Sequence, residues 1–93
     1  MAELTRDDVT ILSTKVRGDH RGDWWHIRID ERFYIVSAVD LPVFLAGYRT
    51  SETMAFAADE TGQVTSWSDL AMVERKDHWA CIDQLLESLG GEA

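Results

Sequence analysis

The side chains of this sequence that could do metal or covalent chemistry are three histidines, His20, His26 and His78, and one cysteine, Cys81. A histidine metal site needs a second ligand at a spacing that a helix or a hairpin brings onto one face. None of the three histidines has such a ligand, and the sequence contains no GxxxxGK[ST], GxGxxG, CxxC or HExxH motif. We therefore expect no bound metal and no cofactor.

His78 and Cys81 are three residues apart in a predicted helix, a spacing at which the two side chains can meet. A neighbouring histidine can activate a cysteine as a thiolate nucleophile. Cys81 also borders an apolar stripe of that helix, and free cysteine usually behaves as a small buried apolar residue. We favour the buried role and predict no catalytic residue, since a chain of this length offers little room for a catalytic cleft.

Charge is the most informative property of the sequence. The 93 residues hold 17 acidic and 9 basic side chains, for a net charge of −8, and residues 51–93 account for −7 of it. Nucleic acid is not an expected partner, because phosphate binding needs a basic surface. Two acidic pairs lie in the C-terminal half, Asp59 and Glu60 at a predicted turn and Asp83 and Glu87 on an exposed helix face.

The placement of the second pair opposes helix stability. Asp83 and Glu87 are like charges four residues apart, at a cost of about 0.2–0.5 kcal/mol. Glu87 also lies near the negative end of the helix dipole, while Arg75 and Lys76 lie just before its positive end. A solvated acidic face remains the simpler interpretation, and an acidic surface that docks on a basic groove is the alternative.

Trp24 and Trp25 are adjacent in a predicted strand, so their side chains must point to opposite faces of the sheet. One of them lies on the less apolar face. We expect the C-terminal helix to cover it, and otherwise Trp24 is an exposed aromatic anchor for a partner.

The elements that would hold these residues follow from periodicity and turn residues. Strands are predicted at about 9–16, 24–30, 33–39, 53–58 and 63–67, and a helix at about 77–89. Asp77 is the predicted helix cap, Gly90 and Gly91 its end, and Trp79, Ile82, Leu85, Leu86 and Leu89 its buried stripe. The predicted fold is α+β, a five-stranded antiparallel meander with one C-terminal helix packed on a face.

Two hairpins fix the register of this sheet. With Glu31 and Arg32 as the turn, Ile29 faces Tyr34, Ile27 faces Val36 and Trp25 faces Ala38 on one apolar face. Pro42 is expected to end that hairpin, and a long connection, 41–52, follows it. Residues 59–62 fit a type I turn with Gly62 in the left-handed position.

The chain is expected to be a single domain, 1–93, in the cytoplasm. The sequence has no run of about 18 apolar residues, no N-terminal apolar segment typical of a signal peptide and no second cysteine for a disulfide. The repeated Arg-Gly-Asp at residues 17–23 is interpreted as a polar hairpin tip.

The stretch Glu52-Thr53-Met54-Ala55-Phe56, followed by the turn at 59–62 and by Val64-Thr65-Ser66-Trp67, resembles small accessory proteins of bacteriophages and prophages. No established activity comes with this resemblance. It implies a phage-encoded protein acting in the host cytoplasm, similar to inhibitors of host defence such as anti-CRISPR or anti-restriction proteins.

These observations lead to one functional expectation and one alternative. The expectation is a non-catalytic acidic protein that binds a basic host protein or nucleoprotein complex, through Asp59, Glu60, Asp83, Glu87 and Trp24. The alternative is a self-associating accessory or structural protein, with the apolar stretch 41–48 and one sheet face forming a homodimer.

Overall fold

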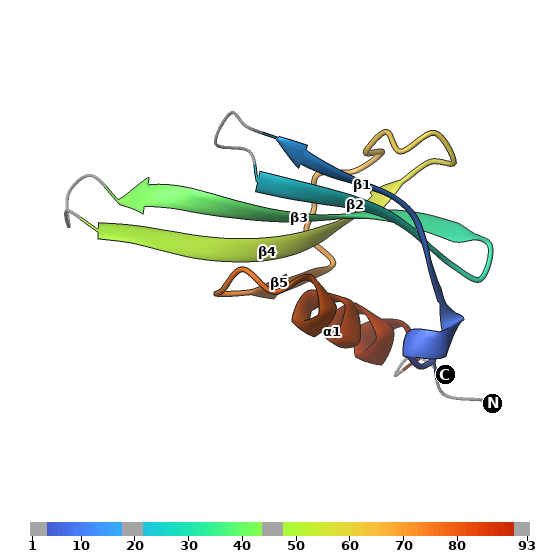
Figure 1. The fold of residues 1–93 in the computed structure, drawn as a ribbon. Helices are drawn as coiled ribbons and strands as arrows, with labels where there is room; N and C mark the ends of the chain where they lie inside the picture. The colour runs from blue at the N-terminus through green and yellow to red at the C-terminus, as the bar shows by residue number, and fades with distance from the viewer. Residues whose placement is uncertain (1–3, 18–21, 44–47, 91–93) are drawn as a thin grey trace.

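One open sheet of five antiparallel strands, with a single C-terminal helix packed against it, forms the fold in the computed structural model (Figure 1). The structure describes residues 4–17, 22–43 and 48–90. Each strand pairs with the next along the chain, which confirms the predicted α+β meander. In chain order the elements are η1 (Arg6–Asp8), β1 (Val9–Arg17), β2 (Gly22–Ile29), β3 (Arg32–Val43), β4 (Tyr48–Ala58), β5 (Ala71–Val73) and α1 (His78–Gly90).

The β2–β3 hairpin has a different register from the predicted one. Ile27 pairs with Tyr34 and Ile29 with Arg32, so the two turn residues are Asp30 and Glu31. Asp30 has φ 56°, the left-handed conformation that a two-residue hairpin needs at its first turn position and that Asp tolerates. The register differs by two residues, and because side chains alternate with a period of two, every residue stays on its predicted face.

The helix covers the apolar face of the sheet. Ile27, Val36 and Ala55 of the sheet and Ile82 and Leu85 of α1 are all 0% exposed. The predicted helical stripe is confirmed, since Leu86 is also buried and Trp79 and Leu89 pack partly against the same core. Trp25, and not Trp24, is the tryptophan that faces the helix, where its ring stacks on that of His78 at 4.3 Å between centroids.

Asp77 caps α1 as predicted, and a threonine of β4 holds the same end. The Asp77 carboxylate accepts a hydrogen bond from the Ala80 N–H at 3.0 Å. The hydroxyl of Thr53, which is 0% exposed, donates to the Arg75 carbonyl at 2.7 Å and accepts from the Asp77 N–H at 3.0 Å. This hydroxyl therefore links the segment that precedes α1 to the middle of β4.

The prediction of a strand at 63–67 is wrong. The turn before it is confirmed, because Gly62 has φ 90° and Asp59 N–H bonds the Gln63 carbonyl at 2.9 Å. After a single bridge between Ala58 and Val64 the chain leaves the sheet, and the fifth strand forms only at Ala71–Val73, beside residues 53–55. A polar Ser-Trp-Ser-Asp stretch (66–69) interrupts the pairing, and the three-residue strand that follows is too short to show a period in the sequence.

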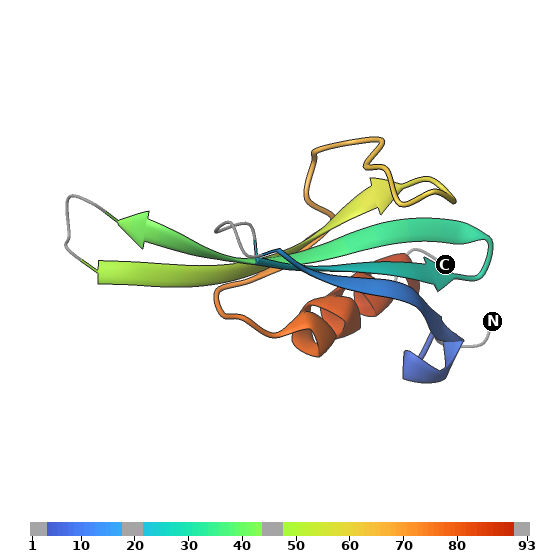
Figure 2. The ribbon, with the colours of Figure 1, turned by 45° about the horizontal axis from the view of Figure 1, so that its top comes forward.

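The segment 59–70 covers the face of the sheet that α1 leaves open. Figures 1 and 2 show this segment, in yellow to orange, on one side of the sheet and α1 on the other. His26, Ile35, Ser37 and Phe56 point to this face, and all four are less than 9% exposed. The His26 ring bonds the Asp59 carbonyl through Nε2 at 3.0 Å, which fastens the segment to β2.

Pro42 does not end β3, contrary to the prediction. It pairs with Arg49 in a ladder that continues to Val43 and Tyr48, so strands occupy most of the predicted connection 41–52. The pairing of β2 with β3 stops at Asp23 and Ala38, so among the described residues no second strand flanks β3 here and a residue without an N–H is tolerated. Residues 44–47, and 18–21 of the Arg-Gly-Asp repeat, lie outside the described residues.

Candidate functional site

The antiparallel order of the strands gathers acidic turns at one end of the sheet. Connections in a meander alternate between the two ends, so the β2–β3 turn and the turn after β4 share an end. The pairing of Phe33 with Ala58 accordingly sets Asp30 and Glu31 beside Asp59 and Glu60, at the right of Figure 1.

The N-terminal 3-10 helix η1 and the last turns of α1 lie at this same end. Val9 pairs with Ile29, which places η1 next to the β2–β3 turn, and the Leu4 nitrogen lies near Gly90. We call this region the acidic end and define it by its eight carboxylate residues: Asp7, Asp8, Asp30, Glu31, Asp59, Glu60, Asp83 and Glu87. Two exposed basic residues, Arg6 and Arg32, also lie at this end, whereas Arg17 and Arg49 belong to strand ends at the opposite end of the sheet.

The direction of α1 reinforces the negative potential there. The helix ends at Gly90 with no basic residue in its last turn, so its terminal carbonyls and the negative end of its dipole point to the acidic end. Glu87 adds a full charge one turn before that terminus, and its carboxylate forms no hydrogen bond or ion pair with another described residue. Charge and dipole therefore act in the same direction.

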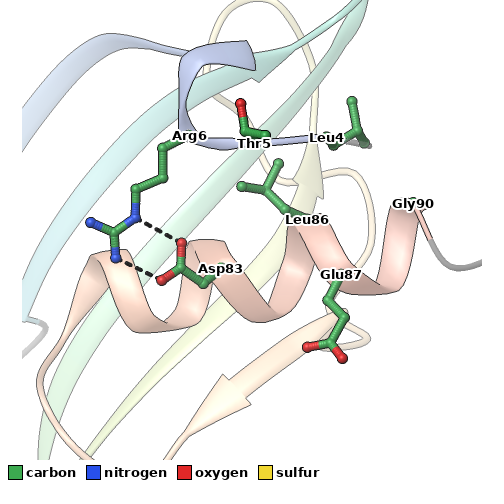
Figure 3. Close-up of a pocket in the computed structure, with 7 residues that line it drawn as sticks. All are labelled: Leu4, Thr5, Arg6, Asp83, Leu86, Glu87 and Gly90. Atoms are coloured by element: carbon green, nitrogen blue, oxygen red, sulfur yellow. Dashed lines mark hydrogen bonds and ion pairs between the residues drawn. The ribbon is translucent and has the colours of Figure 1, made fainter. Parts of the chain in front are cut away.

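Asp83, by contrast, is neutralised by Arg6. The Arg6 guanidinium donates to the Asp83 carboxylate from Nε at 2.8 Å and from Nη2 at 2.6 Å (Figure 3). The same guanidinium lies over the Trp79 ring, at 5.0 Å from its centroid. The hydrogen bond from Arg6 holds the pKa of Asp83 below its ordinary value. The structure therefore gives Asp83 a structural partner, and leaves Glu87 as the accessible charge of this predicted pair.

The two acids of the turn after β4, Asp59 and Glu60, also differ in whether their carboxylates are bonded within the protein. The Asp59 carboxylate accepts from the Thr61 hydroxyl at 2.6 Å, the Thr61 N–H at 2.9 Å and the Gln63 N–H at 3.0 Å, and these bonds lower its pKa. Its role is to shape the turn. Glu60 is exposed and forms no side-chain bond to another described residue, so it is available to a partner.

The structure brings the members of each predicted pair together, and brings both pairs to one end. Asp83 and Glu87 lie on the helix side of the sheet, whereas Asp59 and Glu60 begin the segment that covers the other side (Figure 2). Trp24 is outside the acidic end, because it pairs with Ser37 further along the sheet and its ring contacts Trp67 at 6.4 Å.

Four acids of this end were missed by the sequence analysis: Asp7, Asp8, Asp30 and Glu31. All four are exposed. Within the N-terminal half of the sequence their charges are cancelled by basic residues of both ends of the sheet, such as Arg6 and Arg32 at this end and Arg17 and Arg49 at the other. The alternation of connections in the predicted meander was the signal that could have separated the two ends.

A groove runs around the C-terminal turns of α1 at the acidic end. One hollow of about 470 Å³ lies between η1 and α1 and is lined by Leu4, Thr5, Arg6, Asp83, Leu86, Glu87 and Gly90 (Figure 3). A second hollow shares Leu4 and continues past Leu89 to Asp30 and Glu31, and a third shares Glu31 and Leu89 and ends at Ala58. The groove therefore has apolar walls, and its rim carries Asp30, Glu31, Asp83 and Glu87 together with the basic residues Arg6 and Arg32.

His26, His78 and Cys81 occupy structural positions in the fold, and His20 lies outside the described residues. His26 and His78 lie on opposite faces of the sheet, and each bonds a backbone carbonyl through Nε2. Cys81 is 0% exposed and burial raises the pKa of its thiol to about 12, which is the opposite of nucleophile activation. Within residues 4–17, 22–43 and 48–90, no three His, Cys, Asp or Glu side chains gather as metal ligands would.

Comparison with models of protein families, with curated proteins and with solved structures gave no match. Neither helix of the described residues has the length and apolar character needed to cross a bilayer.

Proposed function

We propose that this chain is a non-catalytic binding protein that occupies a basic surface of a nucleic-acid-handling protein through its acidic end. One observation carries the proposal: acids from η1, the β2–β3 turn, the β4 turn and α1 converge on one end of the sheet, and the terminus of α1 points there. A compact surface of one sign attracts an oppositely charged surface over a distance and accelerates the encounter.

The groove gives this surface a shape that a partner can enter. A Lys or Arg side chain can lay its aliphatic stem along Leu4 and Leu86 while its charged group meets Glu87 and the last carbonyls of α1.

The resemblance to phage accessory proteins supplies the first class of partner to test. Defence complexes of bacteria that bind nucleic acid carry channels lined with Lys and Arg, and an acidic protein can compete for such a channel. We therefore propose a CRISPR or restriction complex of a bacterial host as the basic partner, with the chain acting in the host cytoplasm.

The test compares two double variants with the same change in net charge. Glu31→Lys with Glu60→Lys reverses the acidic end, whereas Glu52→Lys with Glu74→Lys reverses two acids outside it. Immobilised wild type should retain nucleic-acid-binding proteins from a bacterial lysate at 50 mM salt and release them at about 500 mM, because salt screens surface charges. The first variant should lose this retention and the second should keep it. Equal losses in both variants would reduce the effect to net charge and refute the proposal.

Self-association is the second candidate, and the open edge of the sheet favours it. β1 pairs only with β2, and it exposes Ile11 and Leu12 at 40% and 41%. Two β1 strands could pair across a twofold axis to give one continuous sheet. The register shift between Ile11 and Ser13 interrupts this edge. Light scattering at high concentration decides, since a strict monomer excludes this candidate.

A further inference from the structure

Trp67 is held in an unusual position by the segment that follows β4. Thr65 N–H bonds the Ala57 carbonyl at 2.9 Å and Leu70 N–H bonds the Ala55 carbonyl at 2.8 Å. These two carbonyls are adjacent acceptors on the same edge of β4, so the four residues between the donors, 66–69, are looped out of the ladder. Residues 66–69 therefore interrupt the regular pairing along β4, and Trp67 is the one large side chain in this loop.

The loop returns Trp67 to the sheet face opposite α1. Its ring meets that of Phe56 at 5.3 Å and that of Trp24 at 6.4 Å, with interplanar angles of 64° and 73°. Phe56 and Trp24 flank β3 on either side, so a ring that touches both lies over Ile35 and Ser37. Two edge-to-face contacts with buried or half-buried rings fix the orientation of the indole.

Although both contacts hold it, Trp67 is 68% exposed, the largest exposure among the exposed large apolar side chains of the described residues. A tryptophan selected for stability alone would bury most of its ring, since the stabilisation scales with the apolar area removed from water. A rigid and mostly exposed indole is instead typical of the residues that dominate binding energy at interfaces.

The surrounding charges favour a cationic group on this ring. Asp69 is exposed two residues after Trp67 in the same loop, and Glu60 is exposed in the turn that precedes it. The chain carries a net charge of −8, which disfavours both nucleic acid and a second copy of itself as the occupant. A planar guanidinium suits an exposed indole that has carboxylates in the same part of the chain, because it stacks on an indole face and pairs with a carboxylate.

We propose that Trp67 is a stacking site for an arginine side chain of the partner. The site adds a preference for arginine over lysine through its aromatic face, beyond any preference that bidentate pairing with carboxylates gives at the acidic end. The inference rests on the proposed function only for the assumption that the partner is basic.

The test uses two synthetic peptides of equal length and charge, octa-arginine and octa-lysine, titrated into ¹⁵N-labelled protein. The indole N–H resonance of Trp67 is assigned from a Trp67→Phe variant, and that of Trp25, which stacks on His78 on the helix side, is the internal control. We expect octa-arginine to bind about two- to fivefold more tightly than octa-lysine, the range of an exposed cation–π contact. Octa-arginine should also shift the Trp67 indole more than the Trp25 indole.

Two substitutions separate stacking from coverage of the sheet. Trp67→Leu keeps an apolar cover over Ile35 and Ser37 and removes the aromatic face, so the preference for arginine should fall. Trp67→Tyr retains an aromatic face and should keep most of the preference. Equal affinity for both peptides in wild type, an unshifted Trp67 indole, or a preference that Trp67→Leu leaves unchanged overturns the inference.

The proposed function fails in a different way. It is refuted if reversal of Glu31 and Glu60 leaves the affinity of both peptides unchanged. In that case a shift of the Trp67 indole that is specific to octa-arginine would still support the stacking site.

Discussion

The hydroxyl of Thr53 should contribute more to stability than its methyl group. Thr53→Val keeps the shape of the side chain and removes the hydrogen bonds to the Arg75 carbonyl and the Asp77 N–H. Each such bond contributes about 0.5–1.5 kcal/mol net, so we expect a loss of about 2 kcal/mol in the free energy of unfolding. Thr53→Ser keeps both bonds and deletes one buried methyl group, for a loss of about 1 kcal/mol.

Urea denaturation followed by tryptophan fluorescence measures both losses. With an m-value of about 1–2 kcal/mol per M for a chain of this size, Thr53→Val should lower the midpoint by about 1–2 M. Thr53→Ser should lower it by about half as much. The reasoning is refuted if the serine variant is the less stable of the two, because packing of the methyl group would then outweigh the link between β4 and the start of α1.

Three further predictions concern Cys81, Gly62 and Asp77. Iodoacetamide at neutral pH should leave Cys81 unlabelled in the folded protein and label it in urea, because burial raises the pKa of its thiol to about 12; rapid labelling of the folded protein would contradict this. Gly62→Ala should lower the free energy of unfolding by about 1–2 kcal/mol, since φ is 90° and the new Cβ would lie 3.3 Å from the Nδ1 atom of His26; an unchanged urea midpoint would count against it. The Ala80 N–H holds the pKa of Asp77 below its ordinary value, so this carboxylate stabilises the fold above about pH 4 and the contribution is lost as the pH falls through its folded pKa. Asp77→Asn keeps the cap without the titration and should flatten the loss of stability below about pH 4 in acid unfolding curves; a loss as steep as that of the wild type would contradict this.

The core was predictable because a register error of two residues leaves every side chain on the same face of the sheet. Moving the β2–β3 turn from Glu31 and Arg32 to Asp30 and Glu31 shifts the pairing by two residues, so Ile27 and Val36 stay on the buried face. Helical spacing and the Asp77 cap predicted α1 to within one residue at each end, because both signals lie within the helix and its first turn.

Alternation could not show which face receives the helix. Trp24 was expected under the helix, but Trp25 occupies that place, because both faces of β2 carry large side chains and both are covered. The cover on the Trp24 side comes from residues 59–70, which have no periodic pattern. Their placement depends on contacts such as His26 with Asp59, between residues far apart in the sequence.

The acidic pairs were predictable from composition, but their surroundings were not. Adding charges by sequence halves joined Asp30 and Glu31 to Arg17 and Arg49, although strand pairing puts them at opposite ends of the sheet. The pairing of Asp83 with Arg6 joins residues 77 positions apart, and no local pattern indicates it.

The two layers that cover the sheet both come after β4 in the chain. Residues 59–70 cover one face and α1 covers the other, so the four long strands are complete before either cover exists. Synthesis proceeds from the N-terminus, and a nascent chain that has emerged only as far as residue 58 therefore presents two bare apolar faces, with Ile27 and Val36 on one and Ile35 and Phe56 on the other. Stable folding must wait for α1, and a ribosome paused before residue 78 would expose the chain at the stage when it most needs a chaperone.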